Sequence, residues 1–290
     1  MNILVAGATG AVGRLLVPLL VKEGHQVTGI SRTPEGTERV RRQGASAVQA
    51  DAFDRDGLRR VMAETAPDAV IHQLTALSDA DGETTNRLRV EGTRNLVDAA
   101  ESAGVKRIVA QSISWAYVPG ENPADETEPL DLGAAEPRGG MVDGIRALEE
   151  TVAEMEAGVA LRYGILYGPG TWYAPGGAVA AALAGEPDAR LLANLEADHS
   201  VTSFVHVADA ARATVAALDW PSGPVNVVDD EPAEGRQWLP VLAAALGVPA
   251  PEVRTGRQSG ARGASNELAR SRGWEPEHTT WRYGFAAQDV

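Results

Sequence analysis

The chain has 290 residues, 44% of them hydrophobic, and its 26 basic and 40 acidic side chains give a formal net charge of −14. This length suits one large α/β domain, or such a domain with a modest second lobe. The acidic balance argues against a general nucleic-acid-binding protein, and we interpret the acidic stretch 121–136 as a solvated loop. The chain has no cysteine, which excludes disulfides and thiolate metal sites and is compatible with the cytoplasm, where we expect it. A start without signal-peptide features and the lack of a run of about 18 apolar residues predict no membrane span.

Strand-like and helix-like segments alternate as far as residue 170. Apolar runs with β-branched residues predict strands, and apolar residues at spacings of three and four predict helices. This alternation predicts βαβ units around a parallel sheet, the doubly wound Rossmann-type α/β class. In chain order, the predicted strands cover residues 2–7, 26–32, 46–51, 67–74, 106–112 and 159–170, and the predicted helices cover 11–24, 58–65 and 86–104.

The stretch GATGAVG follows the first predicted strand and opens the first predicted helix, with glycines at positions 7, 10 and 13. Gly7 would permit a tight turn, Gly10 a close approach of the backbone to a pyrophosphate, and Gly13 close packing of the helix on the strand. Amides near Ala11 and Val12 would point at the phosphates, and the helix dipole would add to the attraction. We therefore predict a dinucleotide site here rather than a merely structural turn.

The second predicted strand ends in GISRTPEG, with Ser31 and Arg32 where NAD-selective sites often place an acidic residue. A guanidinium can bind a 2′-phosphate, which favours NADPH over NADH unless Arg32 is only a solvated surface residue. Asp51 ends the third predicted strand, where its carboxylate could accept a hydrogen bond from the adenine amino group or cap a helix. Both interpretations of Asp51 stay open.

The pattern loosens after Gly170. We predict that residues 1–170 form an NADP-binding Rossmann core and that 171–290 form mainly a substrate-binding lobe, with segments at about 201–229 returning to pack on the core. In this part we expect a strand and helix over 202–218, a strand over 223–230 and a helix over 236–247.

Several stretches occur in an order known from one superfamily. After the glycine loop come DAVIHQLTA, VEGTRNLVDAA, KRIVAQS, LRYGILYGPGTWY, SFVHVADAA, NVVDDEP and a late GW. In these motifs the chain resembles the short-chain dehydrogenase/reductase superfamily, in its extended branch of NAD-dependent epimerases and dehydratases, along nearly its whole length. The resemblance implies a Rossmann domain with a small C-terminal substrate lobe. It also implies cofactor contacts from Gly7, Thr9, Gly10, Ala11, Val12, Arg32, Asp51, Ala52, Leu74, Thr75, Ala76, Gln111, Tyr163, Gly164 and Leu166.

The chain departs from the superfamily at the catalytic Tyr-x-x-x-Lys motif. The matching frame holds Met141 and Ile145, and Glu149 matches the glutamate that follows the motif in the superfamily and supports this register. Lysine occurs only at positions 22 and 106, so no other such motif exists in the chain. Ile145 also starts an apolar helical stripe, as expected if it has joined the core.

The superfamily also carries a serine or threonine after the fifth strand. In this chain the position of that residue is taken by Ile113. Its neighbours Ser112 and Ser114 are candidates to polarise the substrate carbonyl. A general acid typically contributes about 10²–10⁴-fold to the rate, so hydride transfer could continue with another proton source. Water, Ser112, Ser114 or Tyr117 could supply the proton, or the substrate could carry its own donor, such as a phenol beside the carbonyl.

The missing tyrosine, the arginine at the second strand and the loop GPGTWYAPGG resemble atypical actinobacterial members, such as angucyclinone ketoreductases of simocyclinone biosynthesis. This resemblance implies NADPH-dependent reduction of a ring carbonyl, the C7 ketone, with substrate-assisted protonation. Aromatic walls suit a flat ligand, although core filling is an equal alternative for each aromatic. The predicted substrate-binding residues are Ser112, Ser114, Trp115, Tyr117, Met141, Tyr167, Trp172, Tyr173 and His206.

Two other functions stay open. A nucleotide-sugar reductase or epimerase could have moved its acid to Ser114 or Tyr117, and a basic cluster after Val253 (Arg254, Arg257 and Arg262) could bind its pyrophosphate. A non-catalytic NADP-sensing regulator would also lack the Tyr and Lys. No His/Asp/Glu cluster has metal-binding spacing, and we interpret His72 as structural and His206 as a pocket-wall residue rather than a base. The pattern predicts no oligomeric state.

Overall fold

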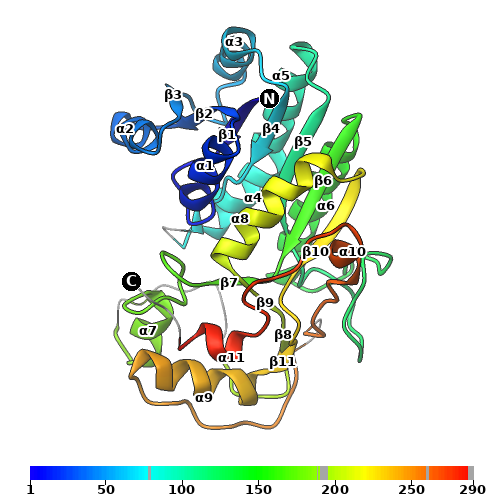
Figure 1. Cartoon of the computed structure of the whole chain (residues 1–290). Coiled ribbons are helices and arrows are strands. Elements are labelled where there is room, and N and C mark those ends of the chain that lie inside the picture. The colour runs from blue at the N-terminus through cyan, green and yellow to red at the C-terminus, as the bar shows by residue number, and fades with distance from the viewer. Residues whose placement is uncertain (78–79, 188, 190–194, 259–260, 287–290) are drawn as a thin grey trace. The chain divides into compact units, whose positions relative to one another are not determined.

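The computed structural model describes residues 1–77, 80–187, 189, 195–258 and 261–286, which form two compact units (Figure 1). Segments 113–134 and 162–170 group with the second unit and 211–224 groups with the first, while the functional division expected at residue 170 stays a prediction. Pairing explains the first of these segments, since Ala124 forms a bridge with Ala264. The first unit contains Met1–Ser112, Ala135–Leu161 and Ala211–Pro224, and the second contains Ile113–Ala134, Arg162–Ala210 and Val225–Val290.

A seven-stranded sheet has the strand order β10-β6-β5-β4-β1-β2-β3. The pairs β1–β2, β1–β4, β2–β3 and β4–β5 are parallel, so the structure has the predicted Rossmann-type α/β fold. The first four strands, in chain order, are β1 (Asn2–Ala6), β2 (Gln26–Ser31), β3 (Ser46–Gln49) and β4 (Ala69–His72). The other three are β5 (Arg107–Ile113), β6 (Ala157–Tyr163) and β10 (Gly223–Val227).

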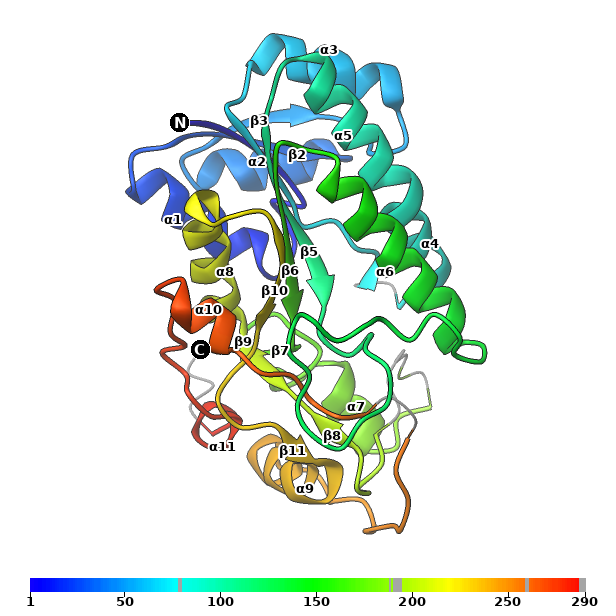
Figure 2. The ribbon, with the colours of Figure 1, turned by 90° about the vertical axis from the view of Figure 1, so that its right-hand side faces the viewer.

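Helices follow the strands, and those predicted over 11–24, 58–65 and 86–104 are present, whereas α2 was not predicted. Helix α5 packs between α3 and α6 on one face of the sheet (Figure 2). The first helices are α1 (Gly13–Lys22), α2 (Pro34–Arg42), α3 (Arg55–Thr65) and α4 (Gly82–Arg87), and α4 continues through a π-helical turn, η2 (Leu88–Gly92), into α5 (Thr93–Ser102). The later ones are α6 (Arg138–Ala153), α8 (Val207–Ala216) and the 3₁₀ turn η3 (Ala217–Asp219).

Local chemistry explains where several helices start. Thr33, Asp54 and Asp81 cap α2, α3 and α4 by accepting hydrogen bonds from backbone amides three residues later, which satisfies amides that a helix start leaves free. Pro18 lies inside α1 on its exposed face. Apolar residues of β1, β4, β5 and the facing helices form a large core cluster of the first unit.

The predicted strand over 159–170 is two strands, because the chain changes partners at Gly164. The amide of Gly164 donates to the carbonyl of Val227 over 3.0 Å, and the next amide, of Ile165, donates to Ser203 over 2.9 Å. The second strand, β7 (Ile165–Tyr167), pairs with β9 (Phe204–His206). The remaining elements of the second unit are β8 (Val201–Thr202), β11 (Ala233–Glu234), α7 (Ala178–Leu183), α9 (Gly235–Leu246), α10 (Glu267–Ser271) and α11 (Trp281–Gly284).

Within the described part of the chain, no helix is both long and apolar enough to cross a membrane.

Candidate functional site

The glycine loop joins β1 to α1, and contacts with backbone atoms fix two of its glycines. Gly7 has φ +90°, and a Cβ there would lie 2.5 Å from the carbonyl oxygen of Gln73. A Cβ on Gly13 would lie 2.2 Å from the carbonyl oxygen of Gly7, so the close packing predicted for Gly13 is confirmed. Val12, at the N-cap of α1, supplies no side-chain cap. The amides of Arg14, Leu15 and Leu16 donate to backbone carbonyls, whereas those of Ala11, Val12 and Gly13 have no acceptor among the described residues, so these three can bind an anion.

Arg32 lies directly after β2 with an exposed side chain. No residue in the described ranges forms a hydrogen bond or ion pair with its guanidinium, while its backbone carbonyl accepts from Gln49 Nε2 over 2.9 Å. Asp51 does not cap a helix, because Asp54 is the N-cap of α3. Instead, Asp51 Oδ1 accepts from the amide of Phe53 over 2.9 Å, which leaves its second oxygen for a ligand.

The predicted cofactor stretch Leu74–Ala76 directly follows β4, where His72 shapes the turn. His72 Nδ1 accepts from the amide of Leu74 over 3.2 Å, so a neutral ring donates from Nε2 to Thr93 Oγ1 over 3.0 Å. Burial lowers the pKa of His72 to about 4. The structural role expected of His72 is therefore confirmed.

Two more predicted cofactor residues, Ala52 and Gln111, lie in the first unit. Ala52 is buried, and its carbonyl accepts from Asn95 Nδ2 over 2.9 Å. Gln111 is half-buried on β5. Tyr163, Gly164 and Leu166 belong to the second unit, where Tyr163 and Gly164 are buried and Leu166 is half-buried.

Helix α6 carries Met141 and Ile145 one turn apart. Ile145 is fully buried, and the stripe expected after it is confirmed by Leu148 and Val152, which pack in the core cluster shared by the strands and helices of the first unit. Met141 is half-buried. Lys106 is exposed and forms an ion pair with Glu156 over 2.8 Å, so this frame of α6 offers no ammonium and no phenol for proton transfer.

The Ser112 hydroxyl donates to Glu149 Oε1 on α6 over 2.7 Å, and Ser112 is 1% exposed. The structure therefore does not support Ser112 as a polarising group, since its hydrogen is already engaged. Ser114 is buried, and its amide donates to the carbonyl of Tyr163 over 2.9 Å. Ser114 stays a prediction.

Tyr117 is buried in the second unit, and its predicted roles as a pocket wall or a relocated acid stay predictions. Its hydroxyl donates to Asn226 Oδ1 over 2.7 Å and accepts from Arg162 over 2.8 Å, and the side chain is 1% exposed. Burial raises its pKa to about 12, which makes it a poor acid at neutral pH. The acidic stretch is also partly structural, because Glu126 accepts from the amide of Asn226 over 2.6 Å.

Most of the other predicted aromatic walls form the core of the second unit. Tyr167 packs edge-to-face on Phe204 and Phe285, and Tyr173 packs on Phe204 and Trp238. Both tyrosines are buried, so the alternative of core filling holds for them. Trp115 and Trp172 are half-buried and keep surface for a ligand.

His206 stacks on His278, a residue that the sequence motifs do not link to it. The rings of His206 and His278 lie 3.7 Å apart at 22°, and His278 Nδ1 lies 2.9 Å from Asp209 Oδ2. One atom from each of the three residues falls within 4.8 Å of the others, as a metal site would require. These groups already hold backbone amides, however, because His206 Nδ1 accepts from the amide of Ala208 over 3.3 Å and Asp209 accepts from the amides of Glu277 and His278.

Two arginines of the basic cluster expected after Val253 form hydrogen bonds with other residues of the protein. Arg262 is 7% exposed and donates to the carbonyl of Asn122 over 2.7 Å and to Glu128 over 3.2 Å. Arg257 donates to the carbonyl of Gly120 over 2.7 Å. These two guanidiniums are therefore engaged in holding loops together, which weakens the case for a sugar-nucleotide pyrophosphate here.

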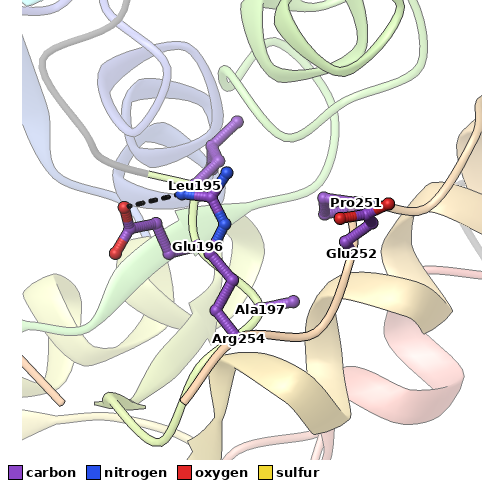
Figure 3. A pocket seen from close by; sticks show the side chains of 6 residues that line it. All are labelled: Leu195, Glu196, Ala197, Pro251, Glu252 and Arg254. Carbon is purple, nitrogen blue, oxygen red and sulfur yellow. Dashed lines mark ion pairs between the residues drawn. The ribbon is translucent and has the colours of Figure 1, made fainter. Parts of the chain in front are cut away.

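Arg254 lines a small cavity with Glu196, and Figure 3 shows their ion pair, whose charged atoms lie 3.8 Å apart. The cavity has a volume of about 180 Å³, below the roughly 300–1,000 Å³ of ligand pockets. It is too small for a polycyclic substrate. The remaining lining residues are Leu195, Ala197, Pro251 and Glu252.

Comparison with known proteins gives a consistent picture. A family model described as the NAD dependent epimerase/dehydratase family matches residues 3–228. The chain is 42% identical to a 3-diazoavenalumate denitrifying reductase of a Streptomyces species, over 99% of this chain and 100% of that protein. It is 34% identical to a UDP-glucose 4-epimerase of Neisseria meningitidis, over 44% of this chain and 42% of that protein. The solved structure of the Thermus thermophilus UDP-glucose 4-epimerase in complex with NAD has a TM-score of 0.77 at 26% identity, covering 99% of this chain and 97% of that one.

Proposed function

The chain belongs to the NAD dependent epimerase/dehydratase family and is a nicotinamide-dependent oxidoreductase, and we propose that it delivers hydride from NADPH to an aromatic substrate with a phenol beside the reacting group. The observation that carries this proposal is the frame on α6, where Met141 and Ile145 can neither give nor take a proton. A substrate that brings its own phenol does not need that relay.

Support for a nicotinamide dinucleotide comes from a relative, and support for NADPH in particular comes from Arg32. The Thermus epimerase binds NAD, which supports a nicotinamide dinucleotide on the glycine loop here. Arg32 follows β2 directly and has an exposed side chain. Its guanidinium is suited to a 2′-phosphate by charge and by geometry.

In the first form of the reaction the acceptor is a ring carbonyl of a polycyclic aromatic polyketide, such as the C7 ketone of an angucyclinone. Hydride adds to the carbonyl carbon, and the carbon–oxygen π pair moves to oxygen. The neighbouring phenol shares its proton with the forming alkoxide, and water restores the phenol. The protein contributes orientation, which can be worth about 7–11 kcal/mol in good cases.

A second possible acceptor is an aromatic diazo group. It is favoured by the Streptomyces reductase, because the match covers 99% of this chain and 100% of that protein. Hydride would form a carbon–hydrogen bond as the carbon–nitrogen bond breaks and N₂ leaves. The two electrons come from NADPH, and the neighbouring oxygen ends as a phenolate that water protonates. No alkoxide forms, so this chemistry also needs no tyrosine.

The test is NADPH consumption with product analysis on two probes. One is a 7-oxo angucyclinone with a peri hydroxyl, and the other is an ortho-diazophenol cinnamate. One alcohol or one molecule of N₂ per NADPH is the expected result for the respective acceptor. Turnover of neither probe, with UDP-glucose epimerised instead, would overturn the proposal.

Methylation of the phenol provides the matched control for substrate assistance. On the ketone probe we expect the methyl ether to be reduced at least about 100-fold more slowly, within the range of a lost general acid. An unchanged rate on the methyl ether would refute the substrate-assisted route while leaving the reductase assignment in place.

A further inference from the structure

Arg89 carries a charge that no described residue neutralises. It lies in the π-turn η2, its side chain is half-buried, and burial alone lowers the pKa of its guanidinium to about 10. No carboxylate or hydrogen-bond acceptor among the described residues contacts it. Its neighbours differ, because Arg87 forms an ion pair with Glu91 over 2.9 Å and Arg94 forms one with Glu154 over 2.6 Å. A desolvated but reachable cation without a partner is costly to keep, which points to a ligand.

Two contacts place the helix that carries Arg89 along α6. Near its start, Asn86 Nδ2 donates to the carbonyl of Gly140 over 3.0 Å, and a Cβ on Gly144 would lie 1.8 Å from Asn86 Oδ1. Further on, Arg94 reaches Glu154 at the end of α6. The two helices therefore run in the same direction, side by side (Figure 2).

Arg89 falls between these two contacts. It follows Asn86 by three residues along the same helix, and the π-turn that carries it packs against α6. That turn faces the part of α6 that follows Gly144, beginning with Ile145. Arg89 therefore brings a cation to the level of α6 at which the superfamily resemblance places a lysine.

The π-turn ties Arg89 to the predicted cofactor edge as well. Thr93, which follows η2, donates to the carbonyl of Leu88 over 3.3 Å and accepts from His72 at the end of β4 over 3.0 Å. The stretch 74–76, predicted to contact the cofactor, starts just after His72. Single π-turns inside helices are frequently found at functional sites. This one is flanked by the hydrogen bond of Asn86 to Gly140 before it and that of Thr93 to His72 after it.

We propose that the Arg89 guanidinium binds the oxyanion of the substrate, the phenolate or forming alkoxide, during hydride transfer. This inference deepens the proposed function and rests on it for the identity of the anion. An anion is a better partner for a desolvated cation than a neutral ribose hydroxyl. The planar fork of a guanidinium also matches two neighbouring oxygens, such as those of a phenol and the carbonyl beside it.

Arg89 would act by charge rather than by proton transfer. A guanidinium stays protonated at neutral pH and has no acceptor atom, so it cannot replace the acid of a Tyr-Lys pair. It can lower the energy of negative charge that develops on oxygen, as oxyanion-binding donors do. This role complements Met141 and Ile145, which supply neither charge nor proton.

The test compares Arg89→Met and Arg89→Lys with the control Arg87→Met, using the whole protein. For Arg89→Met we expect an unchanged or higher Tm without ligand, an NADPH Kd within about twofold of wild type, and a kcat lower by about 10²–10³-fold. Arg89→Lys should recover part of that kcat. Arg87→Met should keep kcat, because Arg87 is paired on the surface.

Two outcomes would overturn the proposal. A lower Tm with unchanged kcat would make Arg89 structural, and a weaker NADPH Kd with unchanged kcat would assign it to the cofactor ribose. A binding probe distinguishes failure of the proposed reaction from failure of anion binding by Arg89. The probe is 1-hydroxyanthraquinone, whose phenolate absorbs at longer wavelength than its neutral phenol. Wild-type protein should lower the phenol pKa of the bound probe relative to Arg89→Met, and an equal value in both would refute anion binding even if no turnover is found.

Discussion

The Ser112 hydroxyl and the Glu149 carboxylate lie 2.7 Å apart and join the end of β5 to the middle of α6. This pair links the residue that the sequence offered as a polariser to the glutamate that supports the register of the missing motif. A hydroxyl that donates to a carboxylate on another element holds the two elements together. It is not free to polarise a substrate carbonyl in this arrangement.

Ser112→Ala should therefore cost stability rather than chemistry. Hydrogen bonds to charged groups contribute about 1.5–3 kcal/mol, so we expect the free energy of unfolding in urea to fall by about that amount. The kcat of the folded variant should stay within about threefold of wild type. Ser102→Ala, which removes an exposed hydroxyl bonded to the carbonyl of Asp98, is the matched control. A loss of kcat above about 100-fold in Ser112→Ala would restore Ser112 as a catalytic group.

Arg32→Ser should change the choice of cofactor. Loss of a charge-assisted contact of about 1.5–3 kcal/mol corresponds to about a 10- to 150-fold weaker NADPH Kd, with the NADH Kd nearly unchanged. Fluorescence titration with each nucleotide measures both constants. Arg39→Ser, on the exposed side of α2, controls for the general loss of positive charge. Equal weakening of both nucleotides in Arg32→Ser would show that Arg32 does not read the 2′-phosphate.

Tyr117→Phe should unfold more readily and still turn over substrate. The change leaves Arg162 and Asn226 without their shared partner inside the second unit, and a buried polar group left unsatisfied costs about 1–3 kcal/mol. Urea unfolding and kcat at a temperature where the variant is folded measure the two effects. Abolished turnover by fully folded Tyr117→Phe would instead support the relocated acid.

Met141→Tyr should not produce a large gain in kcat on a phenol-bearing substrate, because the substrate already supplies the proton. Ile145 remains buried in this variant, so no lysine lowers the pKa of the new phenol. The kcat of the variant is measured on the phenol probe and on its methyl ether. A gain above about tenfold on the phenol probe would contradict substrate assistance.

His72 should make the protein sensitive to mild acid. Its pKa is about 4 in the folded protein and 6.5 in a model peptide, so the unfolded state binds the proton more tightly. The stability gained from the neutral ring is complete above pH 6.5 and is lost as the pH falls toward 4. At about 1.4 kcal/mol for each pKa unit, the loss is roughly 3 kcal/mol. Urea unfolding between pH 7 and 4.5 should show a shallower decline in His72→Gln, and identical slopes would refute this assignment.

The alternation of strands and helices could be predicted from the sequence because it depends on local periodicity. Each buried strand, such as β4 with all four residues buried, needs only its own apolar run. The glycine loop could also be predicted, since Gly7 and Gly13 are required by contacts with backbone within a few residues or at the neighbouring strand. The burial of Ile145 could be predicted from the spacing of its stripe.

Side-chain partners far apart in the sequence could not be predicted in this way. Tyr117 meets Asn226 across 109 positions, and His278 meets Asp209 across 69. No periodicity encodes such pairs, so Tyr117 resembled a pocket wall until its hydroxyl was found engaged. Arg262 resembled part of a phosphate site for the same reason.

The sequence by itself determined the fold class, the glycine loop and the absence of a Tyr-x-x-x-Lys motif, because these depend on residue identity and short-range spacing. Only the tertiary structure decided which polar groups are engaged and which are left for a ligand. Ser112, Tyr117 and Arg262 have partners within the protein, whereas Arg32 and Arg89 have none among the described residues. The physical reason is that desolvation and hydrogen-bond satisfaction depend on neighbours brought together by folding, which the linear order of residues does not reveal.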